Sequence, residues 1–179
     1  MSSTSHPARD DASAPGAGPA YALADAALLA QCDMDTCSSH GPGGQHRNKT
    51  ESAVRLRHQP SGAVAQCQDH RERGQNRAEA LRRLRIRLAT IERGRADPAW
   101  IDPYRRGRQL TLGANARDFP LVAACALDAL ATATGILSVA AAALAVSSSQ
   151  LAHLLTADKE VLQAANKIRS EHGHGVLHG

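Results

Sequence analysis

Residues 76–93 contain the most regular apolar repeat in the chain, and this repeat limits what can surround it. Apolar side chains recur at steps of three and four residues, at Leu81, Leu84, Leu88 and Ile91. Such spacing predicts a helix with one apolar stripe, which must pack on a neighbouring layer. The remaining sides of the helix are expected to face outward, and they carry Arg82, Arg83, Arg85 and Arg87. Gly94 is expected to end this helix.

The segments before this helix predict the layer on which it packs. Residues 31–37, 52–58 and 63–69 alternate in side-chain character with the period of two that strands show. Pro60 and Gly62 between the last two segments are turn residues, so 52–69 is expected to form a hairpin. A short helix is expected over 21–30. The sequence therefore predicts an α+β unit in which a small antiparallel sheet packs on the arginine-rich helix.

The last third of the chain has a different character and predicts an all-α unit. Residues 118–146 are rich in alanine and contain two charged residues, Asp118 and Asp128. Two short helices broken at Thr134-Gly135 fit this segment better than a membrane span, because polar residues interrupt its apolar run. A final helix is expected over 158–172, with Val161, Ala165 and Ile168 buried and Gly173 after its end.

Residues 138–155 resemble a helix-turn-helix. In this interpretation Ala141 lies where the helices cross, and Ser147 or Ser148 caps the second helix. The core positions would be Leu144, Val146, Leu151 and Leu154. Ala145 stands where such motifs usually carry glycine, and residues 148–155 contain no Arg or Lys. Because a DNA reader needs cations for phosphate, a compact helical bundle remains the alternative interpretation, and DNA binding is not expected.

These patterns divide the chain into four parts. Residues 1–20, which lack an apolar signal stretch, are expected to be disordered, and residues 21–94 to form the sheet and its helix. Residues 95–117 are expected to be a basic, irregular linker, and residues 118–179 the helical domain. The four cysteines form no CxxC pair, which favours reduced thiols in the cytoplasm. Neither a metal nor a cofactor is expected.

The charge of the chain is concentrated in its middle. Residues 40–110 contain 16 Arg and Lys against 7 Asp and Glu, whereas the chain as a whole has 21 against 17. Fifteen of these 16 cations are arginine, which suits contacts with phosphate. Only four aromatic residues occur in the chain, so base-stacking platforms are not expected.

A glycine-rich stretch precedes the hairpin, at residues 40–52. It reads HGPGGQHRNKTES and lacks the parts of the common phosphate-binding loops. No nucleophile in the chain has an evident histidine and carboxylate partner by local signature. What remains is a tip of main-chain N–H groups and one amide, which could stabilise a developing negative charge. A mobile surface loop is the alternative.

Residues 40–88 resemble the catalytic domain of class I peptide chain release factors. The resemblance rests on GGQ followed by HxNK, on SAVRLRH, on the PSG turn, on CQD and on Asn76-Arg77, and it covers about a third of the chain. It implies hydrolysis of the peptidyl-tRNA ester in the ribosomal peptidyl transferase centre. The implied partners are peptidyl-tRNA and large-subunit ribosomal RNA.

The resemblance also implies which residues act. The catalytic positions would be Gly43, Gly44 and Gln45: the glycines permit a backbone that side chains would forbid, and the Gln45 N–H helps stabilise the transition state. The Gln45 side chain would favour water as the nucleophile, and it is a candidate for N-methylation. The positions expected to contact RNA are Gly41, Pro42, His46, Arg47, Asn48, Lys49, Arg55, Arg57, Arg71 and Arg77.

Some positions depart from the family pattern. His40 and Arg47 replace a serine and an apolar residue, and Glu72-Arg73 replaces a Ser-Gln pair before the helix. No segment resembles the codon-reading domain of full release factors, so we expect release without stop-codon reading, as in similar ribosome-rescue hydrolases. Residues 118–179 would then dock on the ribosome or on a protein partner. The alternative function is a non-catalytic RNA-binding or helix-turn-helix regulatory module.

Overall fold

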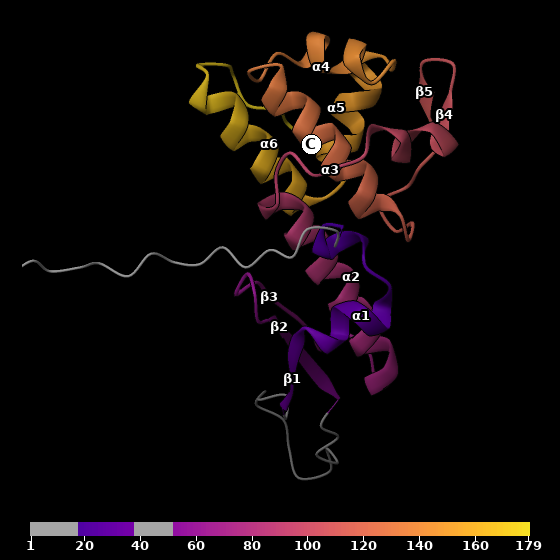
Figure 1. Ribbon diagram of the computed structural model, residues 1–179, viewed down its shortest axis with the longest axis vertical. Helices are drawn as coiled ribbons and strands as arrows, with labels where there is room; N and C mark the ends of the chain where they lie inside the picture. The colour runs from indigo at the N-terminus through magenta and orange to yellow at the C-terminus, as the bar shows by residue number, and fades with distance from the viewer. Residues whose placement is uncertain (1–17, 38–51) are drawn as a thin grey trace, which may run out of the picture.

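The computed structural model describes residues 18–37 and 52–179 (Figure 1). The first elements are η1 (Ala20–Ala22), α1 (Asp25–Ala30), β1 (Cys32–Cys37), β2 (Ala53–His58), β3 (Val64–Cys67) and α2 (Arg73–Ile91). The later elements are η2 (Pro98–Tyr104), β4 (Arg105–Arg106), β5 (Gln109–Leu110), α3 (Phe119–Thr132), α4 (Leu137–Ala143), α5 (Ser148–Thr156) and α6 (Lys159–Glu171). Of the segment 1–20, expected to be disordered, residues 1–17 lie outside the described residues, whereas Ala20 is buried in η1. The α+β fold class is confirmed.

The sheet is antiparallel with the order β1-β2-β3, as the alternating segments predict. Val54 and Leu56 of β2 are buried, whereas Arg55 and Arg57 between them are exposed. The turn after β2 closes through a hydrogen bond from Gly62 N to His58 O of 2.8 Å, and Gly62 has a φ of +69°. The sheet therefore has an apolar face toward α2 and a polar, cationic face away from it.

Helix α2 lies between two cores. Leu81, Leu84 and Leu88 are buried with the sheet, as predicted. Ile86 instead belongs to the core formed by α3–α6. Ile91 is 52% exposed, contrary to the predicted stripe. The helix ends at this residue because Glu92 is already extended.

Helices α3–α6, here called the helical unit, pack at the carboxyl end of α2, opposite the sheet end of the molecule (Figure 1). Helix α3 is buried on most sides, as its alanine-rich sequence allows. Helices α4 and α5 meet at 102°, within the range of helix-turn-helix motifs. Ser147 caps α5 by accepting a hydrogen bond from Gln150 N, and Ala141 and the four predicted core positions are buried.

Two helix ends carry unusual backbone. Ala145 has a φ of 54° and Thr134 a φ of 50°. Each stands just after a helix whose last carbonyls are bonded in the Schellman pattern, as in Val146 N to Ala141 O and Gly135 N to Leu130 O. The break predicted at Thr134-Gly135 is therefore confirmed. Gly173 fills the same position after α6.

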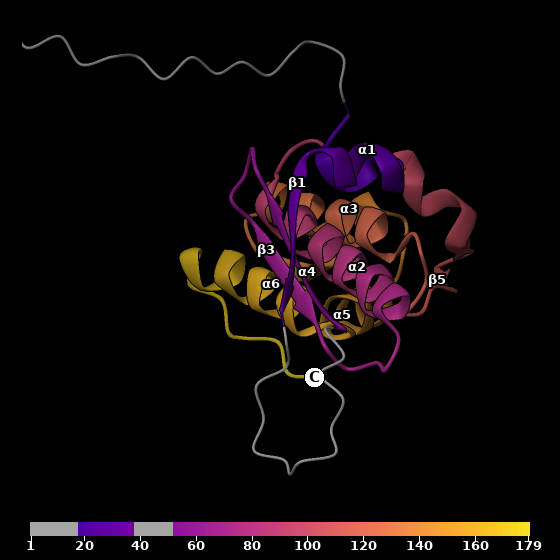
Figure 2. The ribbon, with the colours of Figure 1, turned by 90° about the horizontal axis from the view of Figure 1, so that it is seen from below.

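Residues 95–117 are structured and are not an irregular linker. They contain η2 and the hairpin β4–β5. The Trp100 ring meets the Tyr21 ring edge-on, with centroids 6.1 Å apart. The Asp128 carboxylate accepts hydrogen bonds from Gly94 N and Ala96 N at 2.9 and 3.1 Å. These contacts join η1, the connection and α3, and Figure 2 shows the molecule along its long axis.

No single helix among residues 18–37 and 52–179 has both the length and the hydropathy of a membrane span. The pair α4 and α5 reaches that threshold only when the two helices are taken together across their bend.

Candidate functional site

The glycine-rich stretch connects two strands that are paired at its ends. Cys37, the last residue of β1, is in register with Ala53, the first residue of β2. Paired residues of antiparallel strands lie about 5 Å apart. The three predicted catalytic positions and the RNA positions 41, 42 and 46–49 fall between these strands and lie outside the described residues. The structure therefore defines the base of this stretch.

The Asn76 side chain binds the backbone at the β2 side of that base. It is fully buried, and its Nδ2 donates to Ser52 O at 2.7 Å and to His70 O at 2.8 Å. Its Oδ1 accepts from His70 N at 2.9 Å and from the Cys67 thiol at 3.3 Å. One side chain thus ties the start of β2, the end of β3 and the first turn of α2. Sequence reasoning quoted Asn76 in the motif but gave it no role, since only its burial reveals it.

At the opposite end of β2, the His58 side chain forms hydrogen bonds to two other segments. Its imidazole is buried, with Nδ1 2.7 Å from Ser61 Oγ and Nε2 2.9 Å from Gln31 Oε1. Burial lowers the pKa of His58 below its ordinary value, against a smaller opposing effect of the Glu92 charge. The neutral ring therefore joins the hairpin turn to the segment before β1.

Four of the predicted RNA positions are described, and all four are exposed. Arg55 and Arg57 lie on the outer face of β2, Arg71 precedes α2, and Arg77 lies in its second turn. Within the described residues none of the four has a hydrogen-bond or ion-pair partner. They come from the same strands and helix end that Asn76 holds together. The structure thus presents four exposed cations beside the base of the glycine-rich stretch, none of them paired with another described residue.

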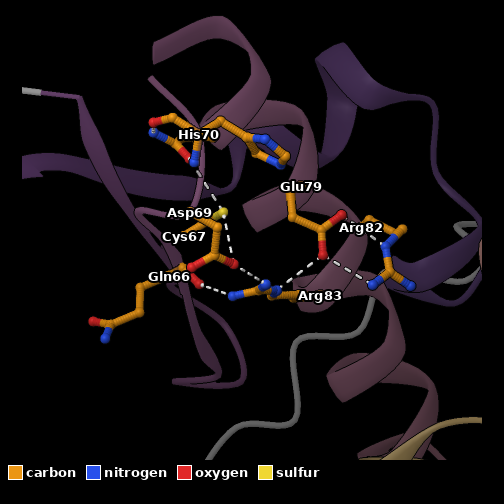
Figure 3. Close-up of polar contacts among 8 residues, drawn as sticks. Gln66, Cys67, Asp69, His70, Glu79, Arg82 and Arg83 are labelled. Carbon is orange, nitrogen blue, oxygen red and sulfur yellow. Dashed lines mark hydrogen bonds and ion pairs between the residues drawn. The ribbon is translucent and has the colours of Figure 1, made fainter. Parts of the chain in front are cut away.

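The arginines in the middle of α2 behave differently, which corrects the prediction that they face outward. Figure 3 shows the Arg83 guanidinium between Asp69 and Glu79, at 2.5 and 2.9 Å. Arg83 also donates to Gln66 O at 3.0 Å. Arg82 binds the same Glu79 through two hydrogen bonds of 2.9 Å. The pKa of Glu79 is lowered chiefly by its hydrogen bond from Arg82, and that of Asp69 by its hydrogen bond from Arg83.

Arg85 and Arg87 join elements that are distant in the sequence. Arg85 binds Asp25 at 2.7 Å. Arg87 donates to Val64 O at 2.6 Å and forms a two-pronged ion pair with Glu160 of α6, at 2.6 and 3.2 Å. Arg83 and Arg87 thereby occupy backbone carbonyls of β3, which is an edge strand. These arginines hold the fold together and block a sheet edge.

Comparison with known proteins finds similarity over residues 29–109. Residues 29–109 match the RF-1 domain family. Peptide chain release factor 1 of Rhodospirillum rubrum is 53% identical over 66 residues, which are 37% of this chain and 19% of that protein. Peptide chain release factor 2 of Bordetella avium is 52% identical over 59 residues, 33% of this chain and 16% of that protein. The match therefore spans less than a fifth of these relatives, and residues 110–179 lie beyond the RF-1 domain.

Proposed function

Because the chain carries an RF-1 domain and belongs in that part to the GGQ peptide chain release factor family, we propose that it hydrolyses peptidyl-tRNA on the ribosome without reading a stop codon. The substrate is the ester that links the nascent peptide to tRNA. The protein acts in translation termination on stalled ribosomes, in the cytoplasm, with ribosomal RNA and peptidyl-tRNA as its partners.

The observation that carries this proposal is the base of the glycine-rich stretch. The register of Cys37 with Ala53 and the four contacts of Asn76 give both ends of the stretch a fixed origin. A fixed base lowers the entropy lost when a tip enters a narrow RNA site. Arg55, Arg57, Arg71 and Arg77 beside it are exposed and have no partner among the described residues, which suits contacts with the phosphates of such a site.

The chemistry proposed for the tip needs no protein base. Gly43 and Gly44 let the main chain approach the ester carbon, and the Gln45 N–H donates to the oxyanion of the tetrahedral intermediate. Water attacks the carbonyl carbon, the bond to the tRNA ribose oxygen breaks, and that oxygen takes up a proton. The Gln45 amide restricts the nucleophile to one the size of water. Gly41, Pro42, His46, Arg47, Asn48 and Lys49 hold the tip against RNA.

In this proposal the helical unit, and not a stop codon, directs the domain to its ribosomes. It packs directly on the carboxyl end of α2, where Ile86 enters its core and Arg87 binds Glu160. The helical unit lies outside the RF-1 domain match, and we propose that it docks the domain on the ribosome or on a partner protein. The relatives named above are release factors 1 and 2, so codon dependence is the property to measure.

The experiment compares release from two kinds of ribosome. Ribosomes carrying labelled peptidyl-tRNA are stalled at the end of a truncated mRNA, or with a stop codon in the A site, and released peptide is counted. The proposal predicts release from the truncated complex that a stop codon does not increase. Release that requires the stop codon would overturn the codon-independent part alone.

A binding module without turnover is the second candidate, and the 102° crossing of α4 and α5 is the observation in its favour. It predicts sequence-selective affinity for duplex DNA and no peptide release. A titration of the purified chain against a duplex library separates the two.

A further inference from the structure

The hairpin β4–β5 is a short two-stranded projection at the edge of the helical unit (Figure 1). Arg105 pairs with Leu110 and Arg106 with Gln109, which leaves Gly107 and Arg108 as a two-residue loop. Gly107 has a φ of +59°, and Arg108 is not among the residues with positive φ. A positive φ at the first loop position alone is the pattern of the type II′ turns that suit tight hairpins. The loop therefore holds Arg108 at the tip of the projection.

The hairpin is anchored to the turn between α4 and α5. Arg108 O accepts a hydrogen bond from Ser147 N at 2.9 Å, and Leu110 N donates to Gln150 Oε1 at 3.1 Å. The Arg105 guanidinium donates to Leu144 O at 3.1 Å and pairs with Asp102 at 2.8 Å. Arg105 is thus used in anchoring. Arg108 is held beside Ser147, the residue that caps α5.

The other two arginines of the hairpin, Arg106 and Arg108, carry charge that is paired with no acidic side chain among the described residues. Arg106 and Arg108 are exposed, and among the described residues the Arg106 guanidinium bonds to the backbone oxygens of Pro103 and Arg105 and to no carboxylate. Arg108 has no side-chain partner in the part of the chain that the structure describes. Helix α5, beside them, contains no acidic residue. By contrast, residues 118–179 contain five Asp and Glu against three Lys and Arg, so the positive charge is local to the hairpin.

We propose that the hairpin β4–β5, through Arg106 and Arg108, is a second RNA contact that binds phosphates of ribosomal RNA. Two exposed guanidinium groups on a rigid turn suit phosphate oxygens, and no aromatic or large apolar side chain accompanies them at the tip. The hairpin also supplies the cations that α5 lacks. This inference rests on the proposed function, because it takes the ribosome as the RNA.

The position of the hairpin makes this contact separate from the base of the glycine-rich stretch. That base lies at the sheet end of the molecule and the hairpin at the helical end, with α2 between them (Figure 1). Helix α2 has 19 residues, which correspond to about 28 Å. Two contacts so far apart would fix the orientation of the domain on the ribosome as well as its affinity.

The test is binding of the full chain to purified ribosomes by co-sedimentation, at several salt concentrations. The double variant Arg106→Gln, Arg108→Gln is compared with Lys159→Gln, Lys167→Gln, which removes two exposed cations from α6. The hairpin variant should bind roughly 10-fold more weakly, and its salt slope should fall by about 1 for each lost phosphate contact. The control should bind as the wild type does. Thermal unfolding of both variants checks that the fold is intact.

Unchanged affinity and salt slope in the hairpin variant would overturn the inference. It is also overturned if that variant keeps its ribosome affinity but loses affinity for random duplex DNA, because the surface would then bind DNA. Gly44→Ala distinguishes this inference from the proposed function. If Gly44→Ala releases peptide normally while the hairpin variant still binds weakly, the hydrolytic function fails and the hairpin contact stands.

Discussion

Two sets of arginines on the same domain have opposite environments. Arg55, Arg57, Arg71 and Arg77, at the sheet end, are exposed and have no partner among the described residues. Arg82, Arg83, Arg85 and Arg87, in the middle of α2, each bind a carboxylate. The sequence contains both sets in one basic block, yet within the described residues only the second set is paired with carboxylates. Local charge excess therefore overstates the cationic surface that RNA could contact.

The largest expected difference between a residue that holds the fold and one that contacts RNA is between the adjacent residues Asn76 and Arg77. Asn76→Ala removes the buried partner of three part-buried backbone groups, Ser52 O, His70 O and His70 N, and should lower the free energy of unfolding by about 3 kcal/mol. Arg77→Ala should change it by less than about 0.5 kcal/mol while weakening ribosome binding. Urea unfolding and co-sedimentation measure the two quantities. Equal losses of stability in the two variants would contradict the claim that Asn76 holds the fold and Arg77 does not.

A smaller effect distinguishes Arg87 from Arg57. Arg87→Ala removes the two-pronged ion pair with Glu160 and the bond to Val64 O. Because the pair is partly exposed, the loss should be about 1 kcal/mol of unfolding free energy. Arg57→Ala is the matched control, since its side chain has no partner within the described residues. If Arg57→Ala costs as much stability as Arg87→Ala, Arg57 is a structural residue.

The pH dependence of stability gives the smallest effect. His58 has a pKa below its ordinary 6.5 in the folded protein, so the unfolded chain binds more protons and stability falls as the pH drops below 6.5. Glu79 has a pKa below its ordinary 4.5 beside Arg82, so a second loss follows at lower pH. Arg82→Gln should flatten the second loss, and Arg55→Gln should leave both unchanged. Stability that rises on acidification from pH 7 would contradict these assignments.

The local elements could be predicted from sequence because their signals are local. The strands, the repeat at Leu81, Leu84 and Leu88, and the turn at Ala145 all depend on residues within a few positions of one another. The partners of the arginines could not be predicted in this way, since Arg87 binds Glu160 across 73 residues and Arg85 binds Asp25 across 60. The prediction that residues 95–117 form a linker was wrong for the same reason. Asp128 fixes the chain at Gly94 and Ala96, and it lies more than 30 residues away in the sequence.

The candidate site likewise contains features that a local sequence pattern predicts and one that it does not. The motif of the glycine-rich stretch predicts its chemistry, and the alternation of β2 predicts the exposure of Arg55 and Arg57. The role of Asn76 depends on its burial and on four bonds to three segments, which no local pattern encodes.

The most direct test of the central claim is the single-turnover rate of peptide release at saturating protein, on ribosomes stalled with labelled peptidyl-tRNA. Gly113→Ala is the matched control for Gly44→Ala, because a Cβ at Gly113 meets nothing within 4 Å and its φ is not positive. We predict that the wild type and Gly113→Ala release peptide at the same rate, and that Gly44→Ala lowers this rate at least about 100-fold with unchanged ribosome binding. Equal release by all three proteins would contradict the claim that the glycine-rich stretch hydrolyses peptidyl-tRNA.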